Sequence, residues 1–310
     1  MENLGKKLGH IIIPLATPFT QDTQAVDYTA AERLVDHLIT ENKCDSLIVA
    51  GTSGEFNSMS FQERVDLFRV VKNAVAGRVP LVAGACSDST KEVIALTKEA
   101  ESLEFDAVMA LGPCYCKPTQ QGAYLHYSAV AQSTSLPVML YNIPIFMGFN
   151  LDMQTLARLV EHHENIVAIK DEAGINPTQM SDFAQVTPEN FTVYNGDDIM
   201  VLCGLAQGAA GVVSGGSIVI GKFMREMINA FLAGDLAKAQ KIHMDLNPFF
   251  KAFGSNGRIN PIPLWKAAIN MCGLEVGPPR LPLDPASEAE TQIMREYLER
   301  LGLLQTAACV

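Results

Sequence analysis

Short, nearly continuous apolar segments recur along the chain and alternate with longer amphipathic ones. Strands that are apolar on both faces are typical of a parallel sheet covered by helices. Eight segments are predicted to be such strands, namely Ile11–Leu15, Leu47–Ala50, Leu81–Ala83, Ala107–Leu111, Val138–Tyr141, Val167–Ile169, Phe191–Tyr194 and Gly211–Val213.

The segments between these strands have helical periodicity. Residues 27–40 carry apolar side chains at spacings of three and four, as one face of a helix does. Ser60 and Glu63 form the pattern of a capping box, which predicts a helix that runs through Val75. Further helices are predicted over Ser89–Ser102, Gln120–Gln132, Asp152–His162 and Pro177–Gln185.

Eight strand–helix units in succession, without a linker, predict an α/β fold of the (β/α)8 TIM barrel type. An open doubly wound sheet would be expected to have a Gly-rich dinucleotide loop after its first strand, but Ala16-Thr-Pro-Phe follows instead. Beyond the barrel, a C-terminal α-helical appendage is predicted. We expect residues 1–220 to form the barrel with the active site, and 221–310 to supply its last helix and the extension. The helices expected there are Gly221–Ala233, Leu236–Phe253, Pro263–Met271 and Glu288–Leu301.

Two predicted strands end in reactive side chains, Tyr141 and Lys170. A lysine at the edge of an apolar core is poorly solvated, which makes its neutral amine easier to reach. A neutral amine can attack a ketone and form a Schiff base. The alternative is a lysine that extends its ammonium to solvent, beside a tyrosine that only packs its ring at the top of the core.

Other strand ends add polar groups, and in a barrel of this kind the chemistry lies at these ends. Gly51-Thr52-Ser53-Gly54-Glu55 offers hydroxyls and backbone N–H groups that could hold a carboxylate, although an ordinary glycine turn has the same pattern. The fourth strand leads to Tyr115 on a Pro-containing loop. The seventh leads to Gly196 and Asp198, where the glycine would let a substrate approach closely, and the eighth ends at Val213.

Composition and charge restrict the possible functions. The chain has 310 residues, 48% of them hydrophobic, and a net charge of −11, which argues against a nucleic-acid surface. We expect no membrane span, because no apolar run is long enough, and we expect a cytoplasmic location because seven irregularly spaced cysteines indicate reduced thiols. The histidines and the Cys114/Cys116 pair lack metal-site partners, so we predict no metal.

The strand-end motifs, taken in order, resemble the dihydrodipicolinate synthase / N-acetylneuraminate lyase family of Schiff-base aldolases. The resemblance covers nearly the whole chain. The motifs that carry it are Pro14-Leu-Ala-Thr-Pro-Phe19, Gly51-Thr-Ser-Gly-Glu55, Gly112-Pro-Cys-Tyr-Cys-Lys-Pro118, Tyr141-Asn-Ile-Pro144, Ile169-Lys-Asp171, Gly196-Asp-Asp198, Asn260-Pro-Ile-Pro263 and Arg280-Leu-Pro-Leu283.

The resemblance implies a role for each matching residue. Lys170 would form the imine with pyruvate or another 2-oxo acid, and Tyr141 would shuttle the proton. Thr52 would link Tyr141 to Tyr115 in a hydroxyl relay, with Tyr115 lent across a subunit interface, and Thr52 and Ser53 would bind the substrate carboxylate. No cofactor or metal is implied. The resemblance alone suggests a homotetramer built as a dimer of dimers.

The chain departs from the family pattern where substrate specificity lies. Synthases of the family have an arginine that binds the carboxylate of aspartate semialdehyde, and Phe146 stands at that position here. Phenylalanine cannot make a charge-assisted pair. Of the polar residues that sialate lyases place around the sugar tail, Asp198 is retained, whereas Glu172, Ile199 and Gly215 differ.

We therefore predict a class I 2-oxo-acid aldolase or lyase that acts on pyruvate or a 2-keto-3-deoxy sugar acid. The candidate substrate contacts are Thr52, Ser53, Gly196, Val213, Phe146 and Asp198. One alternative is a genuine 4-hydroxy-tetrahydrodipicolinate synthase, which condenses pyruvate with aspartate semialdehyde. Another is a non-catalytic 2-oxo-acid-binding protein on the same barrel.

Overall fold

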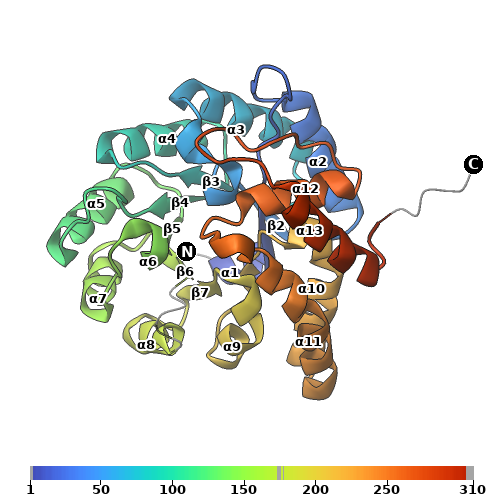
Figure 1. The fold of residues 1–310 in the computed structure, drawn as a ribbon. Helices are drawn as coiled ribbons and strands as arrows, with labels where there is room; N and C mark the ends of the chain where they lie inside the picture. The colour runs from blue at the N-terminus through green and yellow to red at the C-terminus, as the bar shows by residue number, and fades with distance from the viewer. Residues whose placement is uncertain (1–2, 173–175, 177, 305–310) are drawn as a thin grey trace, which may run out of the picture.

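Eight parallel strands close into a barrel in the computed structural model, which describes residues 3–172, 176 and 178–304. Each strand pairs with its sequence neighbours, and β8 pairs with β1, which confirms the predicted (β/α)8 barrel (Figure 1). The strands are β1 (Ile11–Pro14), β2 (Ser46–Val49), β3 (Leu81–Ala85), β4 (Ala107–Leu111), β5 (Val138–Asn142), β6 (Ile166–Asp171), β7 (Thr192–Asn195) and β8 (Val212–Val213).

Every residue of these strands is buried, which is what the continuous apolar runs require. Side chains that point into the barrel form one apolar cluster, and those that point outward form a second cluster with the surrounding helices. In the register, Lys170 of β6 lies opposite Tyr141 of β5 on one side and Tyr194 of β7 on the other. The two reactive strand ends are therefore neighbours.

Helices surround the barrel close to their predicted bounds. The capping box of Ser60 and Glu63 is present at the start of α3, since each side chain accepts a hydrogen bond from the other's backbone N–H. The expected start at Pro177 lies outside the described residues. The helices that follow strands one to six are α2 (Tyr28–Thr40), α3 (Phe61–Val75), α4 (Thr90–Ser102), α5 (Gln120–Gln132), α7 (Met153–His162) and α8 (Gln179–Val186).

Three short helices were not predicted: α1 (Leu4–Leu8), α6 (Pro144–Met147) and α9 (Val201–Ala206). None is longer than six residues, so none shows a full amphipathic period. Helix α1 closes the N-terminal end of the barrel and lies near the centre of the ring in Figure 1. Its backbone is bonded to the first residues of two strands, with Gly5 N donating to Thr192 Oγ1 over 3.2 Å and Ser46 Oγ donating to Leu8 O over 2.8 Å.

After β8, α10 (Ser217–Leu232) completes the barrel, and α11 (Leu236–Ala252), α12 (Ile262–Met271) and α13 (Glu288–Arg300) form the C-terminal appendage. The appendage returns to the mouth of the barrel, because Lys266 of α12 pairs with Glu55 of the loop after β2. We keep as a proposal the division into a barrel (1–220) and an extension (221–310), although residue 220 lies inside α10. Among the described residues, no helix is both long and apolar enough to cross a membrane.

Candidate active site

Lys170 lies at the carboxyl end of β6 with its side chain only 6% exposed. Its Nζ is 3.9 Å from the centroid of the Tyr141 ring. The space for the lysine comes from Gly196 on the neighbouring strand end, where a Cβ would come within 2.8 Å of Lys170 Cε. A buried amine beside an aromatic ring and a glycine is placed as a nucleophile requires, and a lysine that extends to solvent is ruled out by its burial.

Tyr141 is buried to the same depth, and its phenol has two polar neighbours. It donates a hydrogen bond to Glu172 Oε2 over 2.9 Å and is also hydrogen-bonded to the Thr52 hydroxyl. Burial has the largest effect on the pKa of Tyr141, and the negative charge of Glu172 has the next largest. Together they raise this pKa well above its ordinary value. The phenol is therefore suited to donating a proton, and it then needs a neighbouring group from which it can recover one.

The loop after β2 presents Thr52 and Ser53 to the same space. Both residues line the pocket, and the loop is fixed from behind by a hydrogen bond from Thr17 Oγ1 to Gly54 O of 2.7 Å. Glu55 ends the loop in the left-handed conformation, with φ of 56°. It is held by an ion pair to Lys266 Nζ at 2.6 Å and by the Arg280 backbone N–H at 2.8 Å.

A network of amide side chains holds the strand ends that carry Tyr141 and Lys170. Asn142 and Gln179 donate to Asp171 Oδ1 over 2.8 and 2.9 Å, and Leu151 N donates to Asn142 Oδ1 over 3.0 Å. These groups are buried, so each bond also satisfies a polar atom that would otherwise be costly to bury. The network fixes β5 against β6 next to the two reactive residues.

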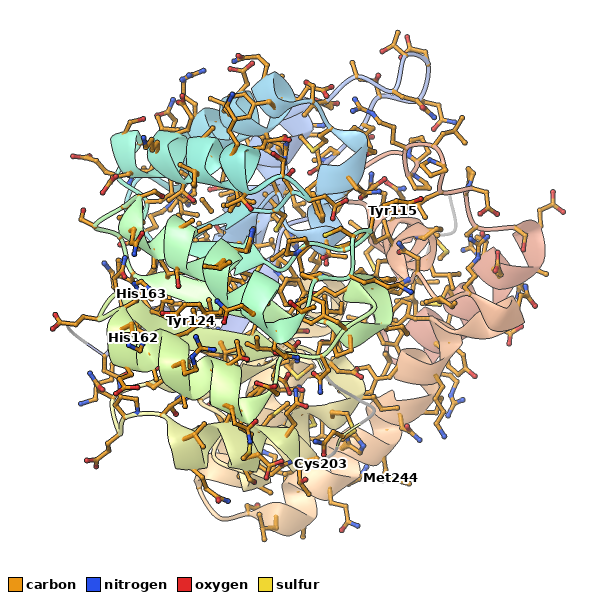
Figure 2. The ribbon with its side chains drawn as sticks, turned by 90° about the vertical axis from the view of Figure 1, so that its left-hand side faces the viewer. Tyr115, Tyr124, His162, His163, Cys203 and Met244 are labelled. Carbon is orange, nitrogen blue, oxygen red and sulfur yellow. The ribbon has the colours of Figure 1, made fainter. Side chains whose placement is uncertain are left out.

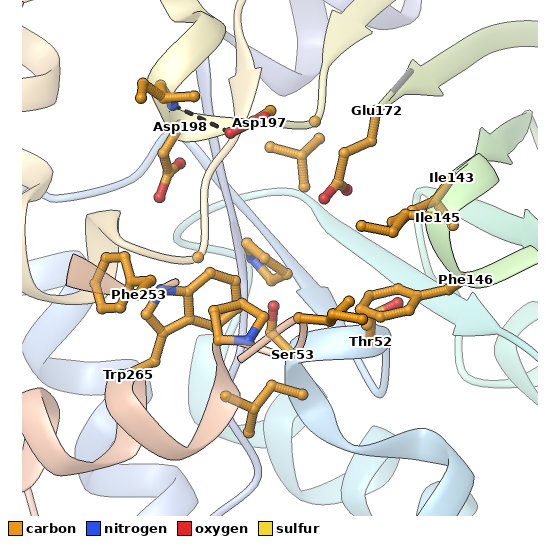
Figure 3. A pocket seen from close by; sticks show the side chains of 18 of the residues that line it. Thr52, Ser53, Ile143, Ile145, Phe146, Glu172, Asp197, Asp198, Phe253 and Trp265 are labelled. Atoms are coloured by element: carbon orange, nitrogen blue, oxygen red, sulfur yellow. Dashed lines mark hydrogen bonds between the residues drawn. The ribbon is translucent and has the colours of Figure 1, made fainter. Parts of the chain in front are cut away.

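One wall of the pocket is acidic. Glu172, Asp197 and Asp198 face the cavity from the ends of β6 and β7 (Figure 3). Burial raises the pKa of all three carboxyl groups, that of Asp198 to about 7. Asp198 also accepts a hydrogen bond from Gly216 N over 2.8 Å. A carboxyl group that can be protonated near neutral pH, as Asp198 can, is suited to binding hydroxyl groups and to transferring protons.

The opposite wall is apolar and aromatic, and it comes partly from the appendage. Phe146 follows β5, Phe253 follows α11, and Trp265 belongs to α12 (Figure 3). The cavity has a volume of about 340 Å³. Arg258, at the edge of the cavity, is paired with Glu290 at 2.5 Å and with Asp284 at 2.9 Å. Lys170 is itself 3.3 Å from Glu172 Oε2, so the lining residues that the structure describes offer no unpaired cation.

The residues predicted from the sequence are brought together with one exception. Lys170, Tyr141, Thr52, Ser53, Gly196, Val213, Phe146 and Asp198 all line this cavity. Tyr115 does not line it and is 91% exposed at the surface of the single chain, as Figure 2 shows. The relay from Thr52 to Tyr115 is therefore not formed within one chain, and the role of Tyr115 across a subunit interface stays a prediction.

Several functional candidates were missed by the sequence reasoning. Glu172 had been noted only as a departure from sialate lyases, and Asp197 had no assigned role. The aromatic residues of α11 and α12 could not be assigned because they are distant in sequence from the strand ends. No group of three His, Cys, Asp or Glu residues within the described ranges is arranged to hold a metal ion.

The family model and the known proteins that are similar to this chain indicate the same family. The model of the Dihydrodipicolinate synthetase family matches residues 7–301. The 4-hydroxy-tetrahydrodipicolinate synthase of Desulforudis audaxviator is 45% identical over 296 residues, which cover 96% of this chain and 98% of that protein.

Solved structures extend this similarity to the fold. The DHDPS of Cyanidioschyzon merolae with lysine bound superposes with a TM-score of 0.91 at 41% identity, covering 96% of this chain and 99% of that one. YagE of Escherichia coli K12, a prophage protein of the dihydrodipicolinic acid synthase family in complex with pyruvate, gives a TM-score of 0.89 at 26% identity, with 95% and 99% covered.

Proposed function

The chain belongs to the dihydrodipicolinate synthetase family, and we propose that it is a class I aldolase whose Lys170 forms an imine with pyruvate or a related 2-oxo acid. The observation that carries this proposal is the buried Lys170 amine, with Tyr141 beside it and the Thr52 and Ser53 hydroxyls on the same cavity. Membership of this family makes the chain an enzyme of the lyase type. The non-catalytic alternative lacks support, because the amine and its acid–base partners are all present.

In the proposed mechanism, the hydroxyls and backbone N–H groups of Thr52 and Ser53 hold the substrate carboxylate, and Lys170 attacks the adjacent keto carbon. The protonated imine withdraws electrons, so the bond to C3 can be made or broken through an enamine. Tyr141 gives a proton to the oxygen that leaves or forms. Gly196 and Val213 leave room for the substrate near the lysine.

The second substrate is proposed to have a neutral, hydroxylated tail, as a 2-keto-3-deoxy sugar acid does. Three carboxyl groups on one wall accept hydrogen bonds from hydroxyls, and Phe146 stands on the other wall. A second carboxylate, such as that of aspartate semialdehyde, would face these acidic groups without a free cation from the described lining. The second candidate function is 4-hydroxy-tetrahydrodipicolinate synthase, which the names of relatives at 40–45% identity favour.

Borohydride trapping tests the imine. Pyruvate with borohydride should add one reduced pyruvyl group, and peptide mapping should place it on Lys170. Lys170→Met, which keeps the length of an apolar chain but has no amine, is the matched control and should stay unmodified. No adduct across a panel of 2-oxo acids, or an adduct on another lysine, would refute the mechanism.

A substrate comparison separates the two candidate functions. Wild-type enzyme should cleave or dehydrate 2-keto-3-deoxy sugar acids and show little turnover in a reductase-coupled assay with pyruvate and aspartate semialdehyde. Phe146→Arg, which supplies the missing cation, should increase turnover of aspartate semialdehyde. Efficient synthase turnover by the wild type would decide for the second candidate.

We further propose that the enzyme is a cytoplasmic homotetramer, a dimer of dimers in which Tyr115 lies near the dimer contact. The exposure of its ring in a single chain supports a partner surface there, since large aromatic side chains are enriched at interfaces. The free thiols of the described cysteines and the biosynthetic relatives support the location. A monomer at micromolar concentration in light scattering would contradict the assembly.

A further inference from the structure

One oxygen of Glu172 joins the two reactive groups of the site. Glu172 Oε2 lies 3.3 Å from Lys170 Nζ and accepts the hydrogen bond of the Tyr141 phenol over 2.9 Å. The carboxyl group follows β6 and points into the cavity (Figure 3), with its side chain 25% exposed. It is therefore in contact both with the amine and with the space that a substrate would occupy.

The ion pair of Lys170 with Glu172 is more exposed than an ion pair that only stabilises the fold. The pair of Lys266 with Glu55 is sealed on both sides, with each side chain 1% exposed. The pair of Lys170 with Glu172 instead opens to the cavity.

The groups around Glu172 set its protonation. Lys170, on the same strand end, favours the ionised carboxylate, and Asp197 from the end of β7 opposes it. The Tyr141 phenol of β5 donates to the carboxylate, and Asp198 adds a second carboxyl group on the same wall. Burial is the largest influence and raises the pKa of Glu172. Its carboxyl can therefore both accept and return a proton.

We propose that Glu172 is a catalytic residue that carries protons from the Lys170 nitrogen to the substrate oxygen, by way of Tyr141, while the imine forms. This proposal rests on the proposed function and assigns its proton carrier. Within one chain, Glu172 would supply the proton relay that would otherwise need Tyr115.

The proton balance of imine formation shows the two transfers. The ammonium of Lys170 gives one proton to Glu172, and the free amine then bonds to the keto carbon while the carbonyl electron pair moves to oxygen. That oxygen takes a proton from Tyr141, which recovers one from Glu172.

The added nitrogen then gives a second proton to Glu172. The hydroxyl leaves as water, with that proton delivered through Tyr141, and the nitrogen lone pair forms the protonated imine. Ammonium and ketone are thereby converted into iminium and water, and Glu172 ends as the carboxylate from which it started.

The test is the rate of imine formation, measured by quenching mixtures of enzyme and pyruvate with borohydride at short times and across pH. Glu172→Gln keeps the size and polarity of the side chain but cannot carry a proton, and trapping should be slower by about a hundredfold or more. In the wild type the rate should fall as the pH falls through the raised pKa of Glu172, because the protonated carboxyl cannot accept from the ammonium. That acid limb should be missing in Glu172→Gln.

Glu172→Asp is the second variant, since it keeps the carboxyl but withdraws it by one methylene. It should trap at an intermediate rate and retain the acid limb, and thermal melting of both variants checks that they fold. If wild-type enzyme traps pyruvate normally and Glu172→Gln does so within about threefold of that rate, the role of Glu172 is overturned while the proposed function stands. If the wild type forms no adduct, both fail.

Discussion

Replacing Lys266 by methionine tests how the appendage holds the active-site loop. Lys266 Nζ lies 2.6 Å from Glu55 Oε1, donates to Pro278 O over 3.0 Å and stands 4.1 Å from the centroid of the Phe19 ring. Methionine fills similar space but removes the charge. Among the described residues, the Glu55 carboxylate then keeps only the backbone N–H of Arg280 as a hydrogen-bond donor, in a place where its side chain is 1% exposed.

The expected loss of stability follows from the buried Glu55 carboxylate, which the substitution leaves without its charged partner. Removing one partner of a buried ion pair typically costs about 3–5 kcal/mol, because the other charge stays buried without compensation. At about 2 °C of melting temperature per kcal/mol for a large domain, Lys266→Met should melt about 6–10 °C below the wild type. Adding Glu55→Gln removes the unpaired carboxylate, so the double variant should lose less stability than the sum of the two single variants, by a coupling energy of about 2 kcal/mol.

The assay is a double-mutant cycle by urea unfolding near neutral pH, where the Lys266 ammonium is charged because burial lowers its pKa only to about 8. KM for pyruvate should rise in Lys266→Met, since Thr52 and Ser53 share the loop that Glu55 ends. A double variant as unstable as the sum of the two single variants would refute the reasoning, because the pair would then carry no coupling.

Four further changes probe the site itself. Tyr141→Phe should lower kcat by about two to four powers of ten with a loss of stability of about 1 kcal/mol or less, and Thr52→Val should give a smaller loss of kcat in steady-state assays. Gly196→Ala should lower kcat/KM about a hundredfold, because the new Cβ would come within 2.8 Å of Lys170 Cε. Burial raises the pKa of Asp198 from 3.8 to about 7, so the folded chain keeps a proton that the unfolded chain loses first. Wild-type stability should therefore fall by up to about 4 kcal/mol from this group as pH rises through that window, and urea unfolding of Asp198→Asn should show a flatter pH profile.

The barrel could be predicted because its strands are apolar on both faces and its turns separate them regularly. β4 (Ala107–Leu111) has the predicted bounds, and β6 extends the predicted Val167–Ile169 by one residue before and two after. Lys170 is the reactive side chain predicted at the end of this strand, and the structure adds Asp171 to the strand after it. Both charged residues are buried, since Asn142 and Gln179 donate hydrogen bonds to Asp171 and Glu172 pairs with Lys170.

The part of the site that could be predicted lies on strand ends, where sequence position determines place in a barrel. Tyr141 and Lys170 follow apolar runs, so their neighbourhood could be inferred from topology. The aromatic wall could not, because Phe253 and Trp265 reach the pocket only through the packing of the appendage on the barrel mouth. Glu172 was also missed, since a carboxylate two residues after a lysine has the same sequence pattern whether or not it turns back toward the amine.

The closure of the barrel floor by α1 has a consequence for how the protein can be attached to a surface. Leu4 and Leu8 are buried with the inward-facing side chains of the strands, and Lys7 pairs with Asp106 just before β4 at 2.6 Å. The chain therefore enters the fold at the pole opposite the cavity. A support or fusion partner joined ahead of α1 would leave the substrate entrance facing the solution, whereas one joined after α13 would lie on the side of the appendage that supplies Trp265 to that entrance.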